Sequence, residues 1–356
     1  MGQSIATPAR VLCRLPTWVG DAVMAVPALR ALRQRYPQAQ LLVQGRKHLR
    51  ALLEGDSGDD PATAAPLFDD FLPDERGNNH KIIAAAKADL AVILPHSFRA
   101  ALEVFRGRVP VRIGYATEGR TQLLTHSLTP ARRGGQRFPV PMVLQYLELV
   151  GVVGALGDGR GPTLSIPAEV AARGAASLQR LGVQPDDRLV GFNPGASFGP
   201  SKIWPAEYVA ATADHYQRAG YRAAVLCGPG EEDLAREIEA QMETTPINTA
   251  DAVLPLDELK VALARCELVI TTDTGPRHMA TSLGVPTVCL MGSTDPRYTN
   301  SHLGPCIVLQ KDVPCGPCHL KVCPYDHHRC MREILPAEVI AAGDRVVALR
   351  AVGRND

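Results

Sequence analysis

The stretch LVITTDTGPRHMATSLGVPTVCLMGSTDP, residues 268–296, decides the fold of the second half of the chain. Its apolar start, Leu268–Ile270, predicts a buried strand, and residues 286–290 predict another. Between the two strands, Pro276 suits the first position of a helix, where its missing N–H removes no hydrogen bond. A strand, a polar turn and a helix in this order leave unpaired amides at the turn, and such amides form a ready anion site.

The turn itself supplies the first candidate site residues. Thr274 or Gly275 suits the N-cap of the helix, and the amides of Gly275, Arg277 and His278 would point outward without helical partners. The side chains of Arg277 and His278 add further donors, and Asp273 lies directly before the cap. The alternative is an ordinary connection in which Asp273 and Thr274 only cap the helix, because short loop motifs have many false positives.

The composition of the whole chain excludes several classes of protein. Its 356 residues are too many for one ordinary core and suit two domains, and its 46% hydrophobic and 21% charged residues are typical of globular proteins. A net charge of +1 gives no basic field for nucleic acid. Residues 1–8 lack the pattern of a signal peptide, so we expect a cytoplasmic protein whose nine cysteines are thiols or metal ligands.

Buried strands alternate with helical segments along both halves of the chain, which predicts an α/β protein with parallel sheets covered on both faces. Gly154–Pro167 is rich in glycine and proline and is predicted to link a domain of residues 1–160 to one of residues 161–356. Ligands of such sheets bind at the carboxyl ends of the strands, so we expect a central cleft between the two halves. The strands are predicted at Val11–Leu15, Leu41–Val43, Leu90–Leu94, Val111–Tyr115, Leu189–Phe192, Ala223–Cys227, Leu268–Ile270 and Thr287–Leu290.

Two further loops follow predicted strands of the second half. The loop NPGASFGPSKIWP, residues 193–205, combines glycines with Lys202, which suits close approach to phosphate oxygens, although it is not a Walker motif. The alternative is a plain connection packed over Trp204. In CGPGEED, residues 227–233, either Glu231 or Glu232 could accept from ribose hydroxyls, or both acids could simply favour the start of a helix.

Asp21 begins the first helix of the first half, directly after the turn that follows the first strand. Its candidate role is that of a general base, and its alternative role is helix capping. Pro27 lies early in the same helix and should bend it. Residues 99–137 contain eight arginines against two acids, so the first domain is expected to meet a phosphate- or carboxylate-bearing partner.

Four cysteines cluster near the C-terminal end, in the pattern C-x2-C-x4-C-x6-C. Such soft ligands could close a structural zinc site or hold an iron–sulfur cluster, and clustered free thiols are the alternative, since the spacing matches neither usual pattern well. The candidate ligands are Cys315, Cys318, Cys323 and Cys330.

Together, four ordered motifs resemble the ADP-heptose:lipopolysaccharide heptosyltransferases across most of the chain. The motifs are WVGD at 18–21, LPHSFRAAL at 94–102, PGASFGPSKIWP at 194–205, and TTDTGPRHMA at 271–280 with the GSTDP that follows. WVGD and FGPSKIWP are closer to heptosyltransferase II than to heptosyltransferase I. The chain departs from the family at Pro276-Arg277, where an apolar pair is usual, and this departure bears on the identity of the donor.

The resemblance implies a GT-B fold, with two Rossmann-like domains facing a central cleft, an acceptor-binding first domain and a donor-binding second domain that ends in the cysteine-rich segment and a terminal helix. It implies inverting, metal-independent transfer of heptose from ADP-L-glycero-D-manno-heptose, without a required cofactor, to the inner core of lipopolysaccharide, as the second heptose onto the first. The alternatives are transfer of another nucleotide sugar and a nucleotide-sugar epimerase. The acceptor would be the phosphorylated Kdo- and heptose-bearing lipid A core, met by a cytoplasmic protein in peripheral contact with the inner face of the inner membrane.

The resemblance also assigns roles to particular residues. Asp21 matches the catalytic base, and Lys202 matches the residue that stabilises the donor phosphates. Because Asp273 is itself negative, we expect it to bind sugar hydroxyls or to brace its loop. The expected donor-binding residues are Ser197, Lys202, Glu231, Glu232, Asp273, Thr274, Gly275, Arg277 and His278, and the expected acceptor-binding residues are Arg99, Arg112 and Arg120.

Overall fold

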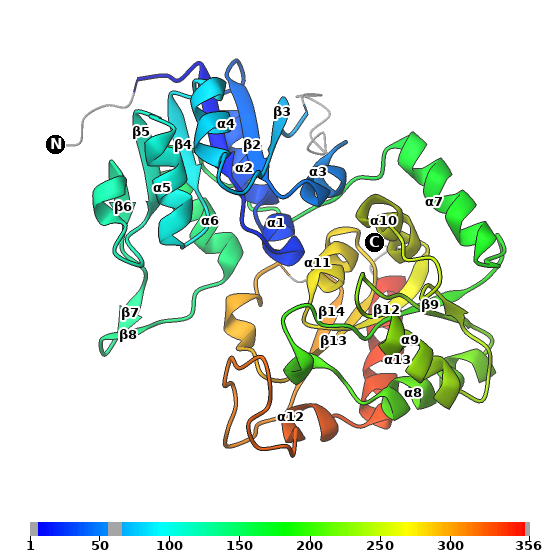
Figure 1. The fold of residues 1–356 in the computed structure, drawn as a ribbon. Helices are drawn as coiled ribbons and strands as arrows, with labels where there is room; N and C mark the ends of the chain where they lie inside the picture. Colours follow the sequence, from blue (N-terminus) through cyan, green and yellow to red (C-terminus); the bar gives the residue numbers. More distant parts are fainter. Residues whose placement is uncertain (1–5, 56–65, 303, 353–356) are drawn as a thin grey trace. The chain divides into compact units, whose positions relative to one another are not determined.

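The computed structural model describes residues 6–55, 66–302 and 304–352, which are drawn as a ribbon in Figure 1. The chain divides into two compact units. Unit 1 is Met1–Ser165 together with Arg297–His302, and unit 2 is Ile166–Pro296 together with Leu303–Asp356. The boundary predicted from the sequence lies after residue 160, and the grouping of Arg297–His302 with the first unit was not predicted.

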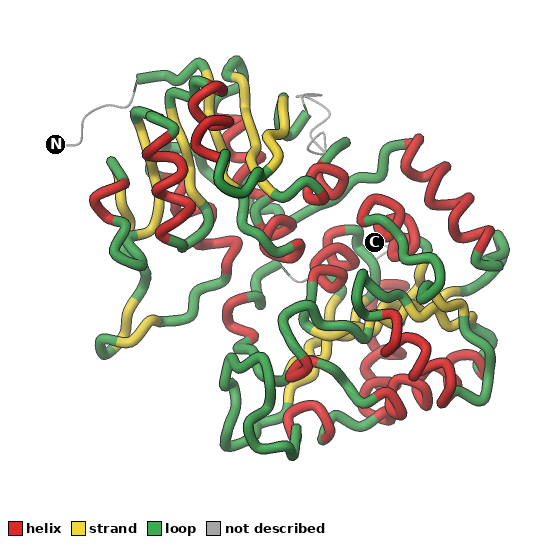
Figure 2. The backbone as a smooth tube through the Cα atoms, in the orientation of Figure 1, coloured by secondary structure: helices red, strands yellow, loops and turns green. Residues whose placement is uncertain are grey.

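The described part of unit 1 contains a six-stranded parallel sheet in the order β3-β2-β1-β4-β5-β6. Figure 2 draws the strands in yellow. A short antiparallel hairpin of β7 (Arg132–Arg133) and β8 (Gln136–Arg137) follows it in the chain. The strands of the sheet are β1 (Arg10–Arg14), β2 (Gln40–Gly45), β3 (Asp70–Pro73), β4 (Leu90–Ile93), β5 (Val111–Tyr115) and β6 (His126–Leu128).

The described part of unit 2 contains a second six-stranded parallel sheet, in the order β11-β10-β9-β12-β13-β14. Its strands are β9 (Leu189–Asn193), β10 (Arg222–Val225), β11 (Ile247–Asn248), β12 (Cys266–Thr272), β13 (Thr287–Met291) and β14 (Cys306–Gln310). Counted within each unit, both sheets have the strand order 3-2-1-4-5-6, which is that of the dinucleotide-binding Rossmann fold.

This shared order determines where ligands can bind. In unit 1 the chain adds β2 and β3 on one side of β1 and then returns to add β4 on the other side. In unit 2 it does the same around β9, with β10 and β11 on one side and β12 on the other. The reversal point therefore lies between β1 and β4 in unit 1 and between β9 and β12 in unit 2. Loops that leave the carboxyl ends of two such strands turn to opposite faces, so a crevice opens between them. The turn before Asp21 follows β1, the loop with Lys202 follows β9, and Asp273 follows β12. The strongest sequence candidates therefore lie at the reversal points of the two sheets.

Helices of unit 1 form two packed pairs, α2 with α6 and α4 with α5, around the apolar strands. The helix expected across Pro27 is interrupted at Ala25, and Pro27 lies in the first turn of α2, where its missing N–H breaks no helical bond. The helices are α1 (Val19–Met24), α2 (Val26–Arg35), α3 (His48–Leu53), α4 (Asn79–Ala86), α5 (Phe98–Arg106), α6 (Met142–Gly151) and the 3₁₀ helix η1 (Thr121–Leu123).

Helices of unit 2 also form two groups, α8 with α9 and α13, and α10 with α7 and α11. The first group encloses the main apolar core, in which the buried Trp204 donates from Nε1 to the carbonyl of Ile334 at 2.9 Å. The helices are α7 (Ala168–Arg180), α8 (Ala206–Arg218), α9 (Glu232–Gln241), α10 (Leu256–Ala264), α11 (Gly275–Ser282), α12 (Arg329–Arg332) and α13 (Pro336–Val352), with 3₁₀ turns η2 (Pro200–Lys202) and η3 (Pro296–Tyr298). Within the described ranges, no helix has both the length and the hydrophobicity to cross a bilayer.

Candidate active site

Asn193 ties together the strand ends around the reversal point of unit 2. It is the last residue of β9, and its side chain is buried. The amide Nδ2 donates to the carbonyl of Leu226 after β10 at 2.7 Å, while Oδ1 accepts from the Thr274 hydroxyl after β12 at 3.3 Å. One short side chain therefore fixes the spacing of the three loops that carry the candidate donor-binding residues.

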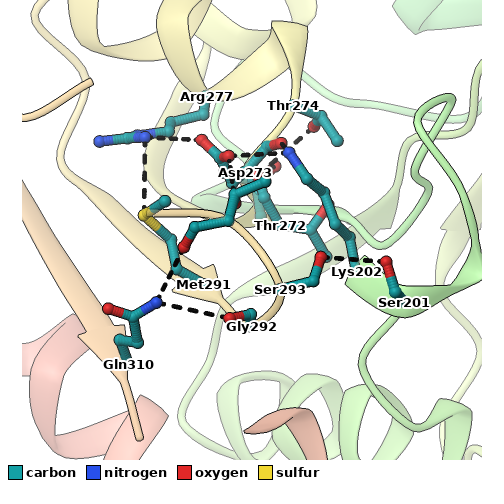
Figure 3. Close-up of polar contacts among 12 residues, drawn as sticks. Ser201, Lys202, Thr272, Asp273, Thr274, Arg277, Met291, Gly292, Ser293 and Gln310 are labelled. Atoms are coloured by element: carbon teal, nitrogen blue, oxygen red, sulfur yellow. Dashed lines mark hydrogen bonds and ion pairs between the residues drawn. The ribbon is translucent and has the colours of Figure 1, made fainter. Parts of the chain in front are cut away.

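Lys202 and Asp273 meet directly at this edge of the sheet (Figure 3). Lys202 Nζ donates to Asp273 Oδ2 at 2.8 Å and to the Asp273 carbonyl at 2.7 Å, and both side chains are buried. The ring of Phe198 lies 5.1 Å from the same ammonium group. Lys202 is thus held at the mouth of the parallel sheet, although in this conformation its charge is directed at a carboxylate of the protein.

Asp273 also accepts hydrogen bonds from two other residues, of which Figure 3 labels Arg277. Arg277 donates to Oδ1 at 2.7 Å, and the Thr294 hydroxyl donates to Oδ2 at 2.9 Å. Burial alone would raise the pKa of Asp273, but the charges of Lys202 and Arg277 hold that pKa well below its usual range. Asp273 therefore remains ionised, and its hydrogen bonds tie Lys202, Arg277 and Thr294 to the loop after β12.

The start of α11 follows the expected pattern. Thr274 is the N-cap, with extended backbone, and the helix begins at Gly275 with Pro276 in its first turn. Burial, followed by the charge of Arg277, lowers the pKa of His278 to about 3, so its imidazole is neutral near pH 7. A neutral imidazole can donate one hydrogen bond and accept another. Ser197, in the loop after β9, is exposed.

Glu231 is the acid that faces the donor loops, and this distinguishes it from Glu232. Its Oε2 accepts from the amide of Gly228 at 2.8 Å. A Cβ built on Gly195 would lie only 1.9 Å from the same oxygen, so the carboxylate packs against the loop that follows β9. Burial raises the pKa of Glu231. Glu232 is the first residue of α9, where an acid favours the helix start.

Asp21 lies in the first turn of α1, just after the turn that leaves β1, and its side chain is partly exposed. No side-chain hydrogen bond caps α1 at Trp18. The Asp21 charge adds to the effect of burial in raising the pKa of Tyr146 on α6, so this phenol stays protonated. Asp21 thus lies at the reversal point of the first sheet, and its role as a general base stays a prediction.

The three arginines expected to bind the acceptor differ in their surroundings. Arg120 is fully buried and donates to the carbonyls of Tyr115, Pro95 and Ser97, so it holds loops of the protein and presents no surface to a substrate. Arg112 donates to the carbonyls of Leu123, Val109 and Pro110. Arg99 alone of the three is largely exposed, in an (i, i+4) pair with Glu103 at 2.8 Å.

Sequence reasoning did not single out a polar cluster at the ends of β4 and β5. The rings of His96 and Tyr115 stack with centroids 5.1 Å apart, and Arg137 of β8 reaches His96 Nδ1 at 3.3 Å. The Tyr115 hydroxyl donates to Glu148 on α6 at 2.5 Å. Burial, then Arg137 and Arg120, lowers the pKa of His96 to about 4. The position of His96 just after the predicted strand Leu90–Leu94 was the sequence feature that could have indicated this cluster.

The cysteine-rich segment contacts the lysine loop through Ser201. The Ser201 amide donates to the carbonyl of Lys321 at 3.0 Å, its hydroxyl donates to the carbonyl of Leu320 at 2.6 Å, and its carbonyl accepts from His328 at 2.9 Å. Gly199, with φ of 154°, passes so close to Lys321 that a Cβ would lie 2.5 Å from its carbonyl oxygen. This segment therefore supports the residue next to Lys202.

The four candidate metal ligands line one small cavity of about 20 Å³. That space is large enough for a single ion or water molecule. All four cysteines are free thiols, and among residues 6–55, 66–302 and 304–352 no three candidate side chains are arranged to hold a metal ion. The donor set fits zinc while its arrangement does not close around an ion, so a metal site here stays a prediction. The ligands in question are Cys315, Cys318, Cys323 and Cys330.

Two Rossmann-like parallel-sheet domains of this strand order make up a GT-B fold. The model of Glycosyltransferase family 9 (heptosyltransferase) matches residues 78–328, and the chain belongs to that family. It is 30% identical to lipopolysaccharide heptosyltransferase 2 of Salmonella typhimurium and 29% identical to that of Escherichia coli, in each case over 82% of this chain and 84% of the relative. The structure of E. coli ADP-heptose lps heptosyltransferase II superposes with a TM-score of 0.77 at 25% identity, covering 96% of this chain and 99% of that one.

Proposed function

We propose that this glycosyltransferase moves heptose from ADP-L-glycero-D-manno-heptose to the inner core of lipopolysaccharide, adding the second heptose to the first. The single observation that carries the proposal is Lys202 held by Asp273 at the reversal point of the second sheet. A cation at that position suits an anionic nucleotide sugar. The relatives named lipopolysaccharide heptosyltransferase 2 support the choice of heptose and of lipopolysaccharide.

The donor role of unit 2 follows from the charge that the reaction develops. Breaking the anomeric C–O bond places positive charge on the sugar and further negative charge on the departing ADP. A fixed cation, Lys202, together with the amides at the start of α11, stabilises that negative charge without reorganising. Glu231 would accept from the adenosine ribose, because its carboxylate is directed at the loops after β9 and β10.

Unit 1 takes the acceptor in this proposal. Asp21 removes the proton from the acceptor hydroxyl as that oxygen attacks the anomeric carbon from the face opposite ADP, which inverts the configuration. The acceptor is the phosphorylated Kdo- and heptose-bearing lipid A core. Arg99, whose side chain is largely exposed, would meet its phosphates or carboxylates. A lipid-linked acceptor implies a cytoplasmic enzyme in peripheral contact with the inner face of the inner membrane.

Mass-spectrometric transfer tests the proposal. The full chain is incubated with ADP-L-glycero-D-manno-heptose and a core acceptor that carries one heptose, in parallel with the D-glycero epimer, ADP-glucose and UDP sugars. We expect a single added heptose from ADP-heptose. Transfer from a different nucleotide sugar only would overturn the assignment of the donor. A control with donor alone detects an epimerase, since a changed sugar without acceptor would identify that activity instead.

A further inference from the structure

A short hairpin of β7 and β8 follows the parallel sheet of unit 1, and its backbone is closed by its own hydrogen bonds. The Phe138 amide donates to the carbonyl of Ala131 at 2.8 Å. The turn is formed by Gly134 and Gly135, whose φ angles of 58° and 79° are both positive, as a two-residue type I′ turn requires. Figure 1 shows the hairpin extending away from the parallel strands of unit 1. It is therefore a defined projection of that unit.

The hairpin is basic and exposed along its whole length. Every residue from 131 to 138 is exposed. Arg132 donates to a carbonyl of its own turn at 2.8 Å, and Arg137 lies 3.3 Å from the ring of His96, which carries no charge near pH 7. In the part of the chain that the structure describes, no carboxylate forms an ion pair with Arg132, Arg133 or Arg137. Three guanidinium groups are thus available to an anion from outside the chain.

The sequence around the hairpin explains why its arginines have no acidic partners. No aspartate or glutamate occurs between Glu118 and Glu148. Exposed arginines elsewhere in the chain are paired: Arg188 and Arg236 each contact an acid, at 2.9 Å and 2.8 Å. The positive charge of the hairpin is therefore a local feature, and it does not follow from the chain as a whole, whose net charge is only +1.

Phe138 places an apolar ring beside these charges. It follows Arg137 directly at the base of the hairpin, and its side chain is 40% exposed. An aromatic ring next to exposed cations suits the surface of a bilayer, where the cations meet headgroups and the ring meets the acyl boundary. A small anionic solute would account for the arginines but not for the exposed ring. Nucleic acid is disfavoured because no wider basic surface accompanies the hairpin in a chain of this net charge.

We propose that the β7–β8 hairpin docks unit 1 on an anionic lipid surface, with its arginines against headgroup phosphates and Phe138 at the interface. Each basic residue close to such a surface strengthens binding about fivefold, so three arginines give a reversible attachment. The closed backbone of the hairpin presents them together, which lowers the cost of ordering them on binding. This inference rests on the proposed function, because such an attachment serves an enzyme whose acceptor is linked to lipid.

Sedimentation of the full chain with lipid vesicles tests the inference. We expect binding to vesicles of phosphatidylcholine mixed with phosphatidylglycerol to exceed binding to phosphatidylcholine alone by about 100-fold, and to fall as salt is added. Arg132→Ser/Arg133→Ser should weaken binding to the anionic vesicles by about 25-fold. Phe138→Ser should also reduce it. The control Arg188→Ser/Arg236→Ser removes the same charge from paired arginines of unit 2 and should change binding by about twofold or less.

Transfer to a deacylated, water-soluble acceptor separates lipid docking from acceptor binding. With no lipid surface present, Arg132→Ser/Arg133→Ser should have the wild-type KM for this acceptor. A raised KM together with unchanged vesicle binding would assign the hairpin to the acceptor and overturn the proposal. Wild-type protein that binds both kinds of vesicle equally would also overturn it. Hairpin-dependent vesicle binding by a protein that transfers no heptose would count against the proposed function alone.

Discussion

The carboxylate of Glu231 occupies the space that a side chain at position 195 would need: a Cβ on Gly195 would lie 1.9 Å from Glu231 Oε2. We expect Gly195→Ala to displace Glu231 and to weaken both ADP and adenosine binding by about tenfold, the cost of one charge-assisted hydrogen bond. Glu231→Gln should have a similar effect, whereas Glu232→Gln should have little. Calorimetry checks the three variants, and equal losses for the two glutamates would remove the distinction between them.

Asp21 is predicted to act in the chemical step alone. Asp21→Asn keeps the size of the side chain but removes the base, so kcat should fall by about 10²- to 10⁴-fold, as for other general bases. Its dissociation constant for ADP should not change, because the proposed nucleotide site lies in unit 2. Steady-state transfer kinetics and calorimetry measure the two quantities. A variant that retained its kcat would exclude Asp21 as the base.

Arg99 and Arg120 should give opposite results when they are substituted. Arg120→Met removes a buried guanidinium from three carbonyls, so the free energy of unfolding should fall by about 3 kcal/mol or more. Arg99→Ala breaks a pair in which the arginine is exposed and Glu103 is largely buried but still paired with Arg14, so stability should change by about 1 kcal/mol or less. Its effect should instead be a higher KM for the acceptor. Urea denaturation and acceptor titration measure these changes, and an unchanged KM would count against a role for Arg99.

The lowered pKa values of His96 and His278 predict that the folded protein loses stability in mild acid. The folded state holds their pKa values at about 4 and about 3, below the ordinary 6.5, so between these values the unfolded chain binds more protons. Stability should therefore be complete above pH 6.5 and should fall as the pH drops below it, by at most about 1.4 kcal/mol per pH unit for each histidine. Urea denaturation at several pH values measures the slope. His96→Phe, which keeps the stacking on Tyr115, should reduce it; an identical slope would contradict the assignment.

Elemental analysis of the purified protein tests the metal prediction. One zinc ion per chain is expected if the four thiols close around the small cavity that they line, because four thiolates are a common structural zinc site. Cys318→Ser should then lose the ion and lower the thermal midpoint of the holoprotein. A metal-free protein whose four thiols all react with a thiol reagent would refute the prediction.

The inner strands of both sheets could be predicted from the sequence, whereas the edge strands could not. Each of the eight strands expected from apolar runs is present, as β1, β2, β4, β5, β9, β10, β12 and β13. The missed parallel strands β3, β6, β11 and β14 are the four edge strands of the two sheets. A strand covered on both faces needs a continuous apolar run, whereas an edge strand such as β6 is only partly buried and leaves no such signal.

Within the site, the sequence indicated which loops carry the chemistry but not which charges face each other. Loop positions follow from strand order, and the motifs after β9 and β12 therefore come together as expected. Arg277 and Arg120 were expected to bind ligands because a guanidinium is a cationic donor that suits phosphate and carboxylate groups. Both are buried against groups of the protein, and their partners, Asp273 and distant backbone carbonyls, are set by tertiary packing. Residue type alone does not reveal such pairing.

The three backbone and side-chain hydrogen bonds that Ser201 makes to the cysteine-rich segment have a consequence for how this chain can vary. That segment lies outside the six parallel strands and could be mistaken for a dispensable insertion. Because it holds the neighbour of a functional lysine, changes in its length or sequence are constrained by the loop it supports. A transplant of the lysine loop into a relative without this segment would transfer the residues but not the support that fixes them.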